Sequence, residues 1–190
     1  MIAGLILAAG AGTRFGDEQK LLADLRGRPL LEHAIRAQCA VPEIQRVVVV
    51  LGANAAGLLA AVDFDHAEPH ICPEWDEGQS ASLRSGIEEL AGAEKVVVTL
   101  GDAPLVTAAV ISRVLAAEPP ARAVYDGQPG HPVVLGPQEL RLIKALTGDH
   151  GARELLSGAR EVECSDLCSG RDVDTREDLE AIRDEARAVL

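Results

Sequence analysis

Short apolar runs alternate with segments of helical periodicity along most of this sequence. The runs are rich in Val and Leu and are continuous rather than alternating, so both faces of each predicted strand should be buried. They fall at residues 2–7, 46–51, 95–100 and 121–125. Buried strands separated by helices predict an α/β fold, in which a mostly parallel sheet is flanked by helices in a Rossmann-like arrangement with right-handed crossovers.

Helical patterns occupy the intervals between these strands. Pro29 can begin a helix because its missing N–H is not needed there, Thr107 is a candidate N-cap, and Thr175 or Asp174 should cap the last helix. One further short strand is expected at residues 131–135. The predicted helices span residues 29–40, 55–62, 80–90, 107–117, 137–146, 151–156 and 176–189.

Composition is typical of a compact enzyme with an aliphatic core. Of the 190 residues, 47% are hydrophobic but only 2% are aromatic, and one domain covering residues 1–190 is expected. The formal net charge of −12 argues against nucleic-acid binding, which needs a basic surface. The sequence shows no pattern of a signal peptide or membrane span, so we expect a cytoplasmic protein without membrane contact.

The cysteines are scattered and do not form a metal-binding pattern. Cys39 and Cys72 stand alone, and Cys164 with Cys168 would supply only half of a zinc site. Reduced thiols in or near the core are therefore expected.

A glycine-rich loop follows the first predicted strand. Gly10, Gly12 and Gly16 have the spacing G-x-G-x-x-x-G, and no Gly-Lys-Ser/Thr of a Walker A loop follows. Small residues that leave a strand expose backbone N–H groups able to surround phosphate oxygens. Arg14 and Lys20 add two cations in an acidic chain, and this combination favours a nucleoside triphosphate over a neutral ligand.

Two aspartates are candidate ligands of a divalent metal. Asp102 directly follows a buried strand, where ligands of parallel sheets bind, although Asp before Ala-Pro can also be a turn former. Asp174, supported by Asp172, is the second candidate, and capping of the last helix is its competing role. Magnesium prefers carboxylate and phosphate oxygens.

Several weaker candidates lie in the middle of the chain. Ser80 and Ser82 either cap a helix or contact a base or ribose, and Gln79 could hydrogen-bond a nucleobase edge. His131 lies beside a proline, so a structural role competes with contact to a second substrate. We find no Ser-His-Asp or Cys-His arrangement that would favour hydrolysis through a covalent intermediate.

Taken in order, the motifs of this sequence resemble those of one family of enzymes. The first, Leu7-Ala8-Ala9-Gly10 through Arg14, Gly16 and Lys20, is similar to the loop of nucleotidyltransferases that activate sugars, polyols and the molybdenum cofactor. The ordered set from the first strand to the last helix resembles the molybdenum cofactor cytidylyltransferases, the MobA- and MocA-like enzymes. The later motifs are Trp75-Asp76-Glu77-Gly78, Gln79-Ser80-Ala81-Ser82-Leu83-Arg84-Ser85-Gly86, Gly101-Asp102-Ala103-Pro104, Gly130-His131-Pro132-Val133, Gly148-Asp149-His150-Gly151-Ala152-Arg153 and Asp172-Val173-Asp174-Thr175.

The resemblance implies a nucleotidyltransferase fold and a Mg²⁺-dependent transfer. The nucleotide would be CTP, because Ala8-Ala9-Gly10 resembles the cytidylyl rather than the guanylyl enzymes, and the acceptor would be the terminal phosphate of molybdopterin. Contact with a molybdoenzyme or a maturation factor is a further implied partnership. Arg14, Lys20 and Asp102 would be catalytic, Asp102 and Asp174 would hold the metal, and His131 and Asp149 would contact the acceptor. The implied nucleotide-binding residues are Leu7, Ala8, Ala9, Gly10, Gly12, Arg14, Lys20, Gln79, Ser80 and Ser82.

Two departures from the family pattern keep alternatives open. Phe15 stands where Met is frequent, and Ala103 stands where Gln is frequent. A sugar, a polyol or another small phosphorylated acceptor is one alternative, and a non-catalytic nucleotide-binding accessory protein is the other. The presence of four charged residues argues against a non-catalytic accessory protein: Arg14, Lys20, Asp102 and Asp174.

Overall fold

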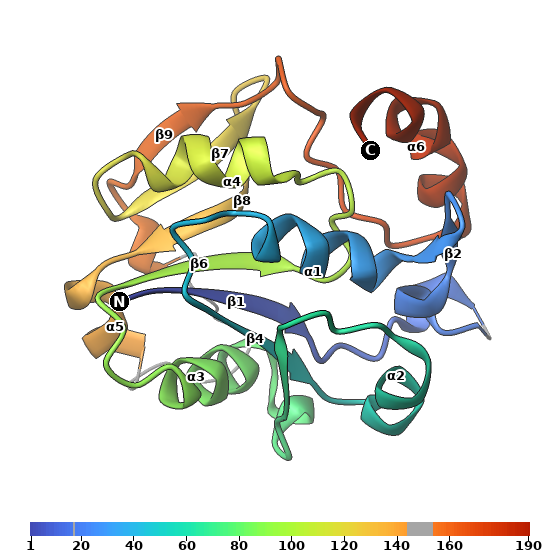
Figure 1. The fold of residues 1–190 in the computed structure, drawn as a ribbon, viewed down its shortest axis with the longest axis horizontal. Coiled ribbons are helices and arrows are strands. Elements are labelled where there is room, and N and C mark those ends of the chain that lie inside the picture. The colour runs from blue at the N-terminus through green and yellow to red at the C-terminus, as the bar shows by residue number, and fades with distance from the viewer. Residues whose placement is uncertain (17, 144–153) are drawn as a thin grey trace.

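The computed structural model describes residues 1–16, 18–143 and 154–190, and its centre is a seven-stranded sheet (Figure 1). The strand order is β5-β4-β1-β6-β8-β7-β9, and β8 runs antiparallel to both of its neighbours while the other pairings are parallel. The strands are β1 (Ile2–Ala8), β4 (Arg46–Leu51), β5 (Glu68–Ile71), β6 (Lys95–Leu100), β7 (Ala121–Tyr125), β8 (Gln128–Leu135) and β9 (Arg160–Glu163). A two-stranded hairpin, β2 (Asp24–Leu25) and β3 (Arg28–Pro29), lies apart from this sheet.

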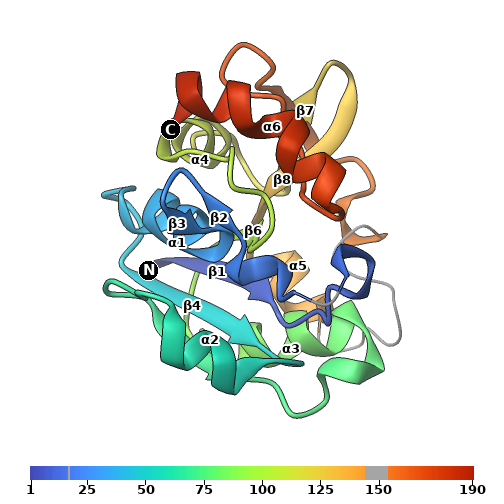
Figure 2. The same ribbon diagram turned by 90° about the vertical axis from the view of Figure 1, so that its right-hand side faces the viewer.

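Helices cover both faces of the sheet (Figures 1 and 2). One apolar cluster joins one face of the strands to α1, α2, α4 and α6, and a second joins the opposite face to α3. Ile6 and Ala8 of β1 belong to the first cluster, whereas Ala3 and Leu5 belong to the second, as expected for side chains that alternate along a strand. The helices are α1 (Leu30–Cys39), α2 (Ala55–Ala61), α3 (Gln79–Glu89), α4 (Ala108–Leu115), α5 (Pro137–Leu142) and α6 (Arg176–Val189).

The four apolar runs are confirmed as β1, β4, β6 and β7, and the mostly parallel α/β fold is confirmed with them. The strand expected at residues 131–135 is longer and begins at Gln128. Asp126 and Gly127, with φ of 49° and 75°, form the two-residue turn that joins β7 to β8, and this Asp-Gly turn explains the antiparallel pairing.

Four strands were not predicted. The main sheet ends in β5 at one side and β9 at the other, and both carry charged or exposed residues because an edge strand needs little apolar surface. The hairpin strands β2 and β3 are two residues each and turn through Arg26 and Gly27, both with positive φ. None of these segments offers the continuous apolar run by which a buried strand is recognised.

The helix boundaries agree with the sequence in most places. Pro29 directly precedes α1, and Thr107 occupies the N-cap position of α4, although its side chain makes no capping hydrogen bond. The predicted helix 137–146 is described as α5 up to Leu142, and residues 144–146 lie outside the described ranges. Of the predicted helix 151–156, the described part, Glu154–Leu156, is a single 3₁₀ turn rather than an α-helix.

The cysteines agree with the expectation of reduced thiols. All four are free, and three of them are buried while Cys39 is partly exposed. Within the described residues, the helices are too short or too polar to cross a bilayer.

Candidate active site

The candidate site lies at the edge of the sheet where the parallel strands β1, β4 and β6 end, which faces the viewer in Figure 2. The glycine-rich loop leaves β1 there, and Gly101 and Asp102 follow β6. Because β8 is antiparallel to β6, its amino end, with Gly130 and His131, reaches the same edge. Ligands of parallel sheets bind at such an edge.

The loop after β1 is shaped by two glycines and one aromatic anchor. Gly12 and Gly16 have φ of 62° and 97°, a region that residues with a side chain rarely adopt. Between them, Thr13–Phe15 forms a 3₁₀ turn in which Phe15 is buried, while the Arg14 side chain is 74% exposed. Phe15, one of the departures from the family pattern, therefore fixes the loop to the core and leaves Arg14 facing solvent.

Lys20 joins the two candidate metal-binding aspartates. Its Nζ lies 2.6 Å from Asp102 Oδ2 and 3.2 Å from Asp174 Oδ1, and its side chain is only 11% exposed. Arg14 Nη2 lies 3.0 Å from the other oxygen of Asp174. Four charged residues that were singled out from distant parts of the sequence thus form one cluster.

The last helix leaves Asp174 available for this cluster. Thr175 is its N-cap: the backbone N–H of Asp178 donates to Thr175 Oγ1 at 3.1 Å, and the backbone N–H of Thr175 donates to Asp178 Oδ2 at 2.7 Å. This reciprocal arrangement is a capping box. Of the two predicted caps, Thr175 is correct, and the Asp174 carboxylate is free to meet Lys20 and Arg14.

Electrostatics in the cluster follow from burial and crowding. Burial lowers the pKa of Lys20, but the charges and hydrogen bonds of Asp102 and Asp174 outweigh burial and raise the pKa above its usual value, so Lys20 is charged. Burial raises the pKa of Asp172, and the nearby charges of Asp102 and Asp174 raise it further. Carboxylates that crowd in this way are stabilised by added positive charge.

The donor set fits a hard divalent cation. Asp102 Oδ1 is buried and accepts no hydrogen bond from the described residues, and Asp174 offers further carboxylate oxygens beside it. Oxygen ligands of this kind suit Mg²⁺ or Mn²⁺ better than softer metals.

Two adjoining cavities form a groove beside the cluster. One, of about 340 Å³, lies against the glycine-rich loop, the start of α3 and Asp102. The other, of about 300 Å³, extends to the start of β8 and is lined in part by Arg122, His131 and Asp172. Leu7, Gln79 and Leu100 line both cavities, so the groove is continuous past the ends of β1 and β6.

The predicted nucleotide-binding residues divide between groove and core. Ala9, Gly10 and Ser82 line the first cavity, whereas Gly12 and Lys20 line a separate cavity of about 310 Å³ at the loop. Ala8 is 4% exposed and packs in the core, so its methyl group does not face the groove.

The structure places the two candidate serines and one of the two candidate histidines. Ser80 and Ser82 do not cap α3, because Gly78 holds the N-cap position and both serines are buried in the first turn. His131 lines the second cavity, and its contact with an acceptor stays a prediction. Asp149 and His150 lie outside the described residues.

Sequence reasoning missed Arg122, which lines the second cavity. Its guanidinium lies 2.6 Å from Glu161 of β9, and its Nε is buried without a hydrogen bond among the described residues. The available sequence feature was an arginine inside an otherwise apolar strand, which is unusual unless a partner or a ligand is present.

Comparisons with known proteins identify the family of this chain. A family model described as the MobA-like NTP transferase domain matches residues 4–164. The chain is 32% identical to nicotine blue oxidoreductase of Paenarthrobacter nicotinovorans over 94% of both chains. It is 30% identical to the purine catabolism protein PucB of Bacillus subtilis over 95% of both.

A solved structure with manganese is also similar. Rv0371c of Mycobacterium tuberculosis H37Rv, in complex with manganese, has a TM-score of 0.81 and 26% identity, with 96% of this chain and 98% of that chain covered. Because the family model covers residues 4–164 of the 190, the chain belongs to the MobA-like NTP transferase domain family of nucleotidyltransferases.

Proposed function

We propose that this protein is a Mg²⁺-dependent cytidylyltransferase that transfers CMP from CTP to the terminal phosphate of a molybdopterin-type acceptor. The observation that carries the proposal is the cluster of Lys20, Asp102 and Asp174, with Arg14 beside it, in which Asp102 borders the groove. Asp102 lines the first cavity, and Asp172 lines the second. Reacting groups from the two cavities would meet at these carboxylates.

The nucleotide would occupy the first cavity and the loop. Backbone N–H groups of the loop and the Arg14 and Lys20 side chains would bind the triphosphate, since Arg can hold two phosphate oxygens at once while Lys supplies a compact charge. Ala9 and Gln79 line the cavity where the base would lie. Asp102 and Asp174 would hold Mg²⁺, which neutralises phosphate charge when it is bound.

The reaction needs positioning more than covalent help. An oxygen of the acceptor phosphate attacks the α-phosphorus of CTP, the bond to the bridging oxygen of the β-phosphate breaks, and pyrophosphate leaves. The nucleophile is already an anion, so no general base is required. Arg14 and Lys20 stabilise the negative charge on the triphosphate as the bond breaks.

The second cavity supplies the acceptor side. His131 and Arg122 offer nitrogen donors for an anionic or hydrogen-bonding group, and Asp149 would add a contact from outside the described residues. A phosphorylated pterin carries both a phosphate and polar ring edges, which suits a cavity with mixed lining. A sugar, polyol or other small phosphorylated acceptor would use the same reaction.

One relative suggests a different chemistry. The name nicotine blue oxidoreductase denotes an oxidation–reduction activity. A loop that binds pyrophosphate could hold either a nucleoside triphosphate or a dinucleotide, so the loop alone does not distinguish the two activities. In this chain the buried Lys20 with two carboxylates favours metal-bound triphosphate.

The test measures pyrophosphate release from each of CTP, GTP, ATP and UTP with Mg²⁺, with and without molybdopterin that carries molybdenum. Release from CTP that requires the acceptor, with formation of the cytidylylated pterin detected by mass, supports the proposal. If pyrophosphate were released only in the presence of a phosphorylated sugar or polyol, that compound would be the acceptor instead of molybdopterin. Oxidation of a reduced nicotinamide dinucleotide by nicotine blue, without pyrophosphate release, would overturn the transferase assignment.

A further inference from the structure

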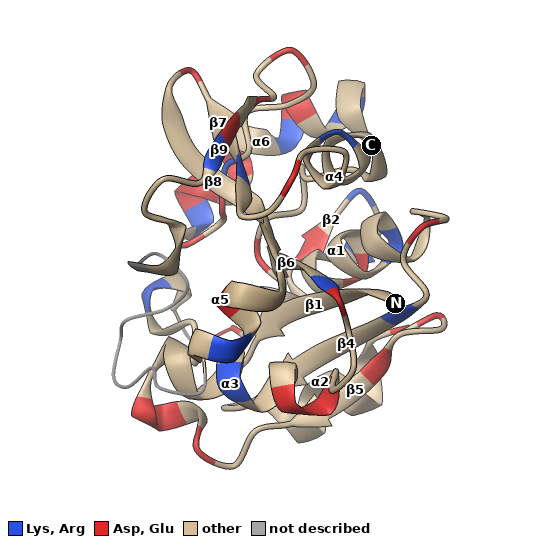
Figure 3. Cartoon of the chain, turned by 90° about the vertical axis from the view of Figure 1, so that its left-hand side faces the viewer, with Lys and Arg blue, Asp and Glu red and all other residues tan. Residues whose placement is uncertain are grey.

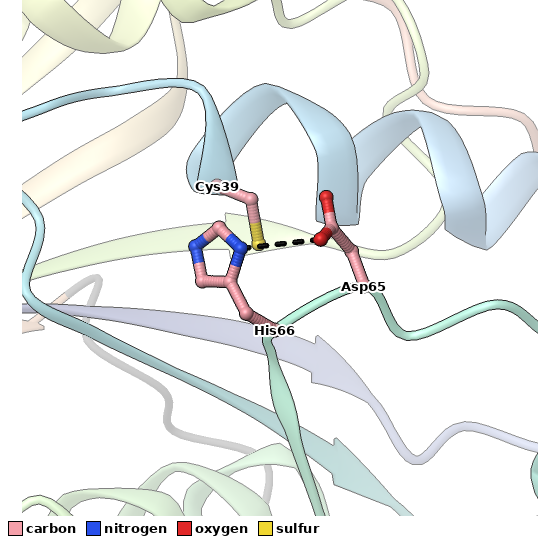
Figure 4. A group of neighbouring side chains, drawn as sticks. All are labelled: Cys39, Asp65 and His66. Atoms are coloured by element: carbon pink, nitrogen blue, oxygen red, sulfur yellow. Dashed lines mark hydrogen bonds and ion pairs between the residues drawn. The ribbon is translucent and has the colours of Figure 1, made fainter.

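A second cluster of metal-binding side chains lies away from the nucleotide groove. It consists of Cys39, the last residue of α1, with Asp65 and His66 from the connection between α2 and β5 (Figure 4). Cys39 Sγ, a carboxylate oxygen of Asp65 and a ring nitrogen of His66 all lie within 4.8 Å of one another. Figure 4 shows the three side chains converging from two separate segments.

The cluster lies at the opposite edge of the sheet from the candidate active site. His66 precedes β5, whose first residue pairs with Val48 of β4, so the connection enters the sheet where the parallel strands begin. Figure 3 views the molecule from this side, with α2 and β5 near one another. None of the three residues lines the groove, so they are not part of the nucleotide site.

Two of the three candidate ligand atoms already lie about as far apart as two ligands of one metal ion. His66 Nδ1 and Asp65 Oδ1 form a hydrogen bond at 3.2 Å, and a metal ion would replace it at a similar separation, because neighbouring ligand atoms on a tetrahedral zinc ion lie about 3.3–3.6 Å apart. The Asp65 and His66 side chains are 47% and 61% exposed, so small rotations can bring all three atoms onto one ion. A water molecule would complete four ligands.

The surroundings of the Cys39 thiol keep it protonated in the absence of a metal. Burial and the Asp65 charge raise the pKa of Cys39 to about 11, and the neighbouring backbone N–H groups of His66 and Ala67 offset only part of this rise. The thiol is therefore protonated at neutral pH without metal.

We propose that Cys39, Asp65 and His66 form a binding site for a borderline-soft divalent metal such as Zn²⁺. Sulfur and imidazole nitrogen select such metals, whereas the oxygen-only set of Asp102 and Asp174 suits Mg²⁺, so the two sites would take different ions. A metal–sulfur bond forms, the S–H bond of Cys39 breaks, and the proton goes to solvent without oxidation or reduction. The bound ion ties the end of α1 to the start of β5.

Cobalt(II) reports this site directly. The full chain, metal-free and reduced, is titrated with Co²⁺, and we expect a thiolate-to-cobalt charge-transfer band that saturates at one ion per chain. Cys39→Ser should abolish the band, and His66→Ala should weaken Co²⁺ binding at least tenfold. Asp102→Asn and the exposed-surface variant Asp184→Asn should leave the band unchanged, because neither touches a sulfur ligand.

Zinc gives an independent measurement. Zn²⁺ at a hundredfold excess over its Kd should raise the Tm by about 5–10 °C in the unmodified chain and clearly less in His66→Ala. Absence of the charge-transfer band at saturating Co²⁺, or its persistence in Cys39→Ser, would overturn the proposal. If Cys39→Ser does not fold, His66→Ala decides, since His66 is exposed, and unchanged Co²⁺ affinity in that variant would equally overturn it.

Discussion

The backbone N–H of Val173 donates to the carbonyl of Asp102 at 2.8 Å. This hydrogen bond joins the segment after β6 to the segment before α6, and it places Asp174 beside Asp102 through the main chain. Lys20 then connects the two carboxylates through side chains. Because the main chain carries the arrangement, changes to a single carboxylate should alter charge while leaving the geometry of the site in place.

Replacement of Asp102 tests the metal site. Asp102→Asn keeps the size of the side chain but removes its charge, so turnover with Mg²⁺ should fall about hundredfold or more, because metal-ion stabilisation is worth several kcal/mol. The measurement is initial-rate pyrophosphate release, with circular dichroism to check the fold. Asp184→Asn, at a 91% exposed side chain, is the matched control and should keep normal turnover. Near-normal turnover of Asp102→Asn at saturating Mg²⁺ would exclude the role.

Replacement of Arg14 separates geometry from charge. Arg14→Ala should lower kcat/KM for the triphosphate, and Arg14→Lys should restore only part of it, since Lys cannot hold two oxygens in a planar fork. Lys20→Ala should also impair turnover and, in addition, lower stability, because it removes the cation that pairs with Asp102 and leaves Asp174 with Arg14 alone. Complete recovery in Arg14→Lys would show that Arg14 supplies general positive charge only.

Base choice depends on the side of the loop that faces the groove. Ala8 and Ala9 are both buried, but only Ala9 lines the first cavity, so Ala9 is the residue able to narrow the approach of a purine. We expect a preference for CTP over GTP of about tenfold to a hundredfold, from an unpaired buried hydrogen-bonding group that costs about 1–3 kcal/mol. Ala9→Gly should reduce that preference. The ratio of kcat/KM for the two nucleotides is the measurement, and an unchanged ratio would remove Ala9 as the determinant.

The buried His33 predicts a loss of stability in mild acid. Its Nε2 donates to the Leu25 carbonyl at 2.8 Å, and burial, with added repulsion from Arg28 and Arg26, lowers the pKa of His33. The unfolded chain therefore binds a proton more readily than the folded chain. The stability that neutral His33 contributes is complete above its unfolded pKa of about 6.5 and is lost as the pH falls towards the lowered folded pKa.

Urea unfolding between pH 7.5 and pH 5 measures this effect. The free energy of unfolding should fall more steeply in the unmodified chain than in His33→Gln, with a difference of at most about 1.4 kcal/mol per pH unit for one proton. Glutamine keeps a donor for the Leu25 carbonyl but does not titrate. Parallel pH profiles for the two proteins would show that other groups cause any acid sensitivity.

The central strands could be predicted because their burial on two faces leaves a continuous apolar run in the sequence. The Val-rich β4 and β6 are examples. The edge strands β5 and β9 have no such run, since water covers part of their surface, and their pairing depends on tertiary contacts. The Asp126-Gly127 turn was a readable local sign of the β7–β8 hairpin, yet it could not by itself show where β8 enters the sheet.

In the candidate site too, features set by neighbouring residues could be predicted from the sequence, whereas contacts between distant segments could not. The loop and the position of Asp102 after a strand are local features, so both could be predicted. The meeting of Lys20 with Asp174 depends on how α6 returns to the sheet, which spacing does not show. The cluster of Cys39 with Asp65 and His66 was not predicted, because its parts come from separate segments that only the fold brings together.

The single reversed strand, β8, makes the groove a composite of two chain segments. The side proposed to bind the triphosphate is built from the turns after β1 and β6, whereas the far wall comes from the β7–β8 hairpin and its neighbours. Substitutions in that hairpin can therefore reshape the second cavity without moving the residues that we propose to bind the phosphates. A scaffold divided in this way allows the choice of acceptor to diversify in evolution while the transfer chemistry stays constant.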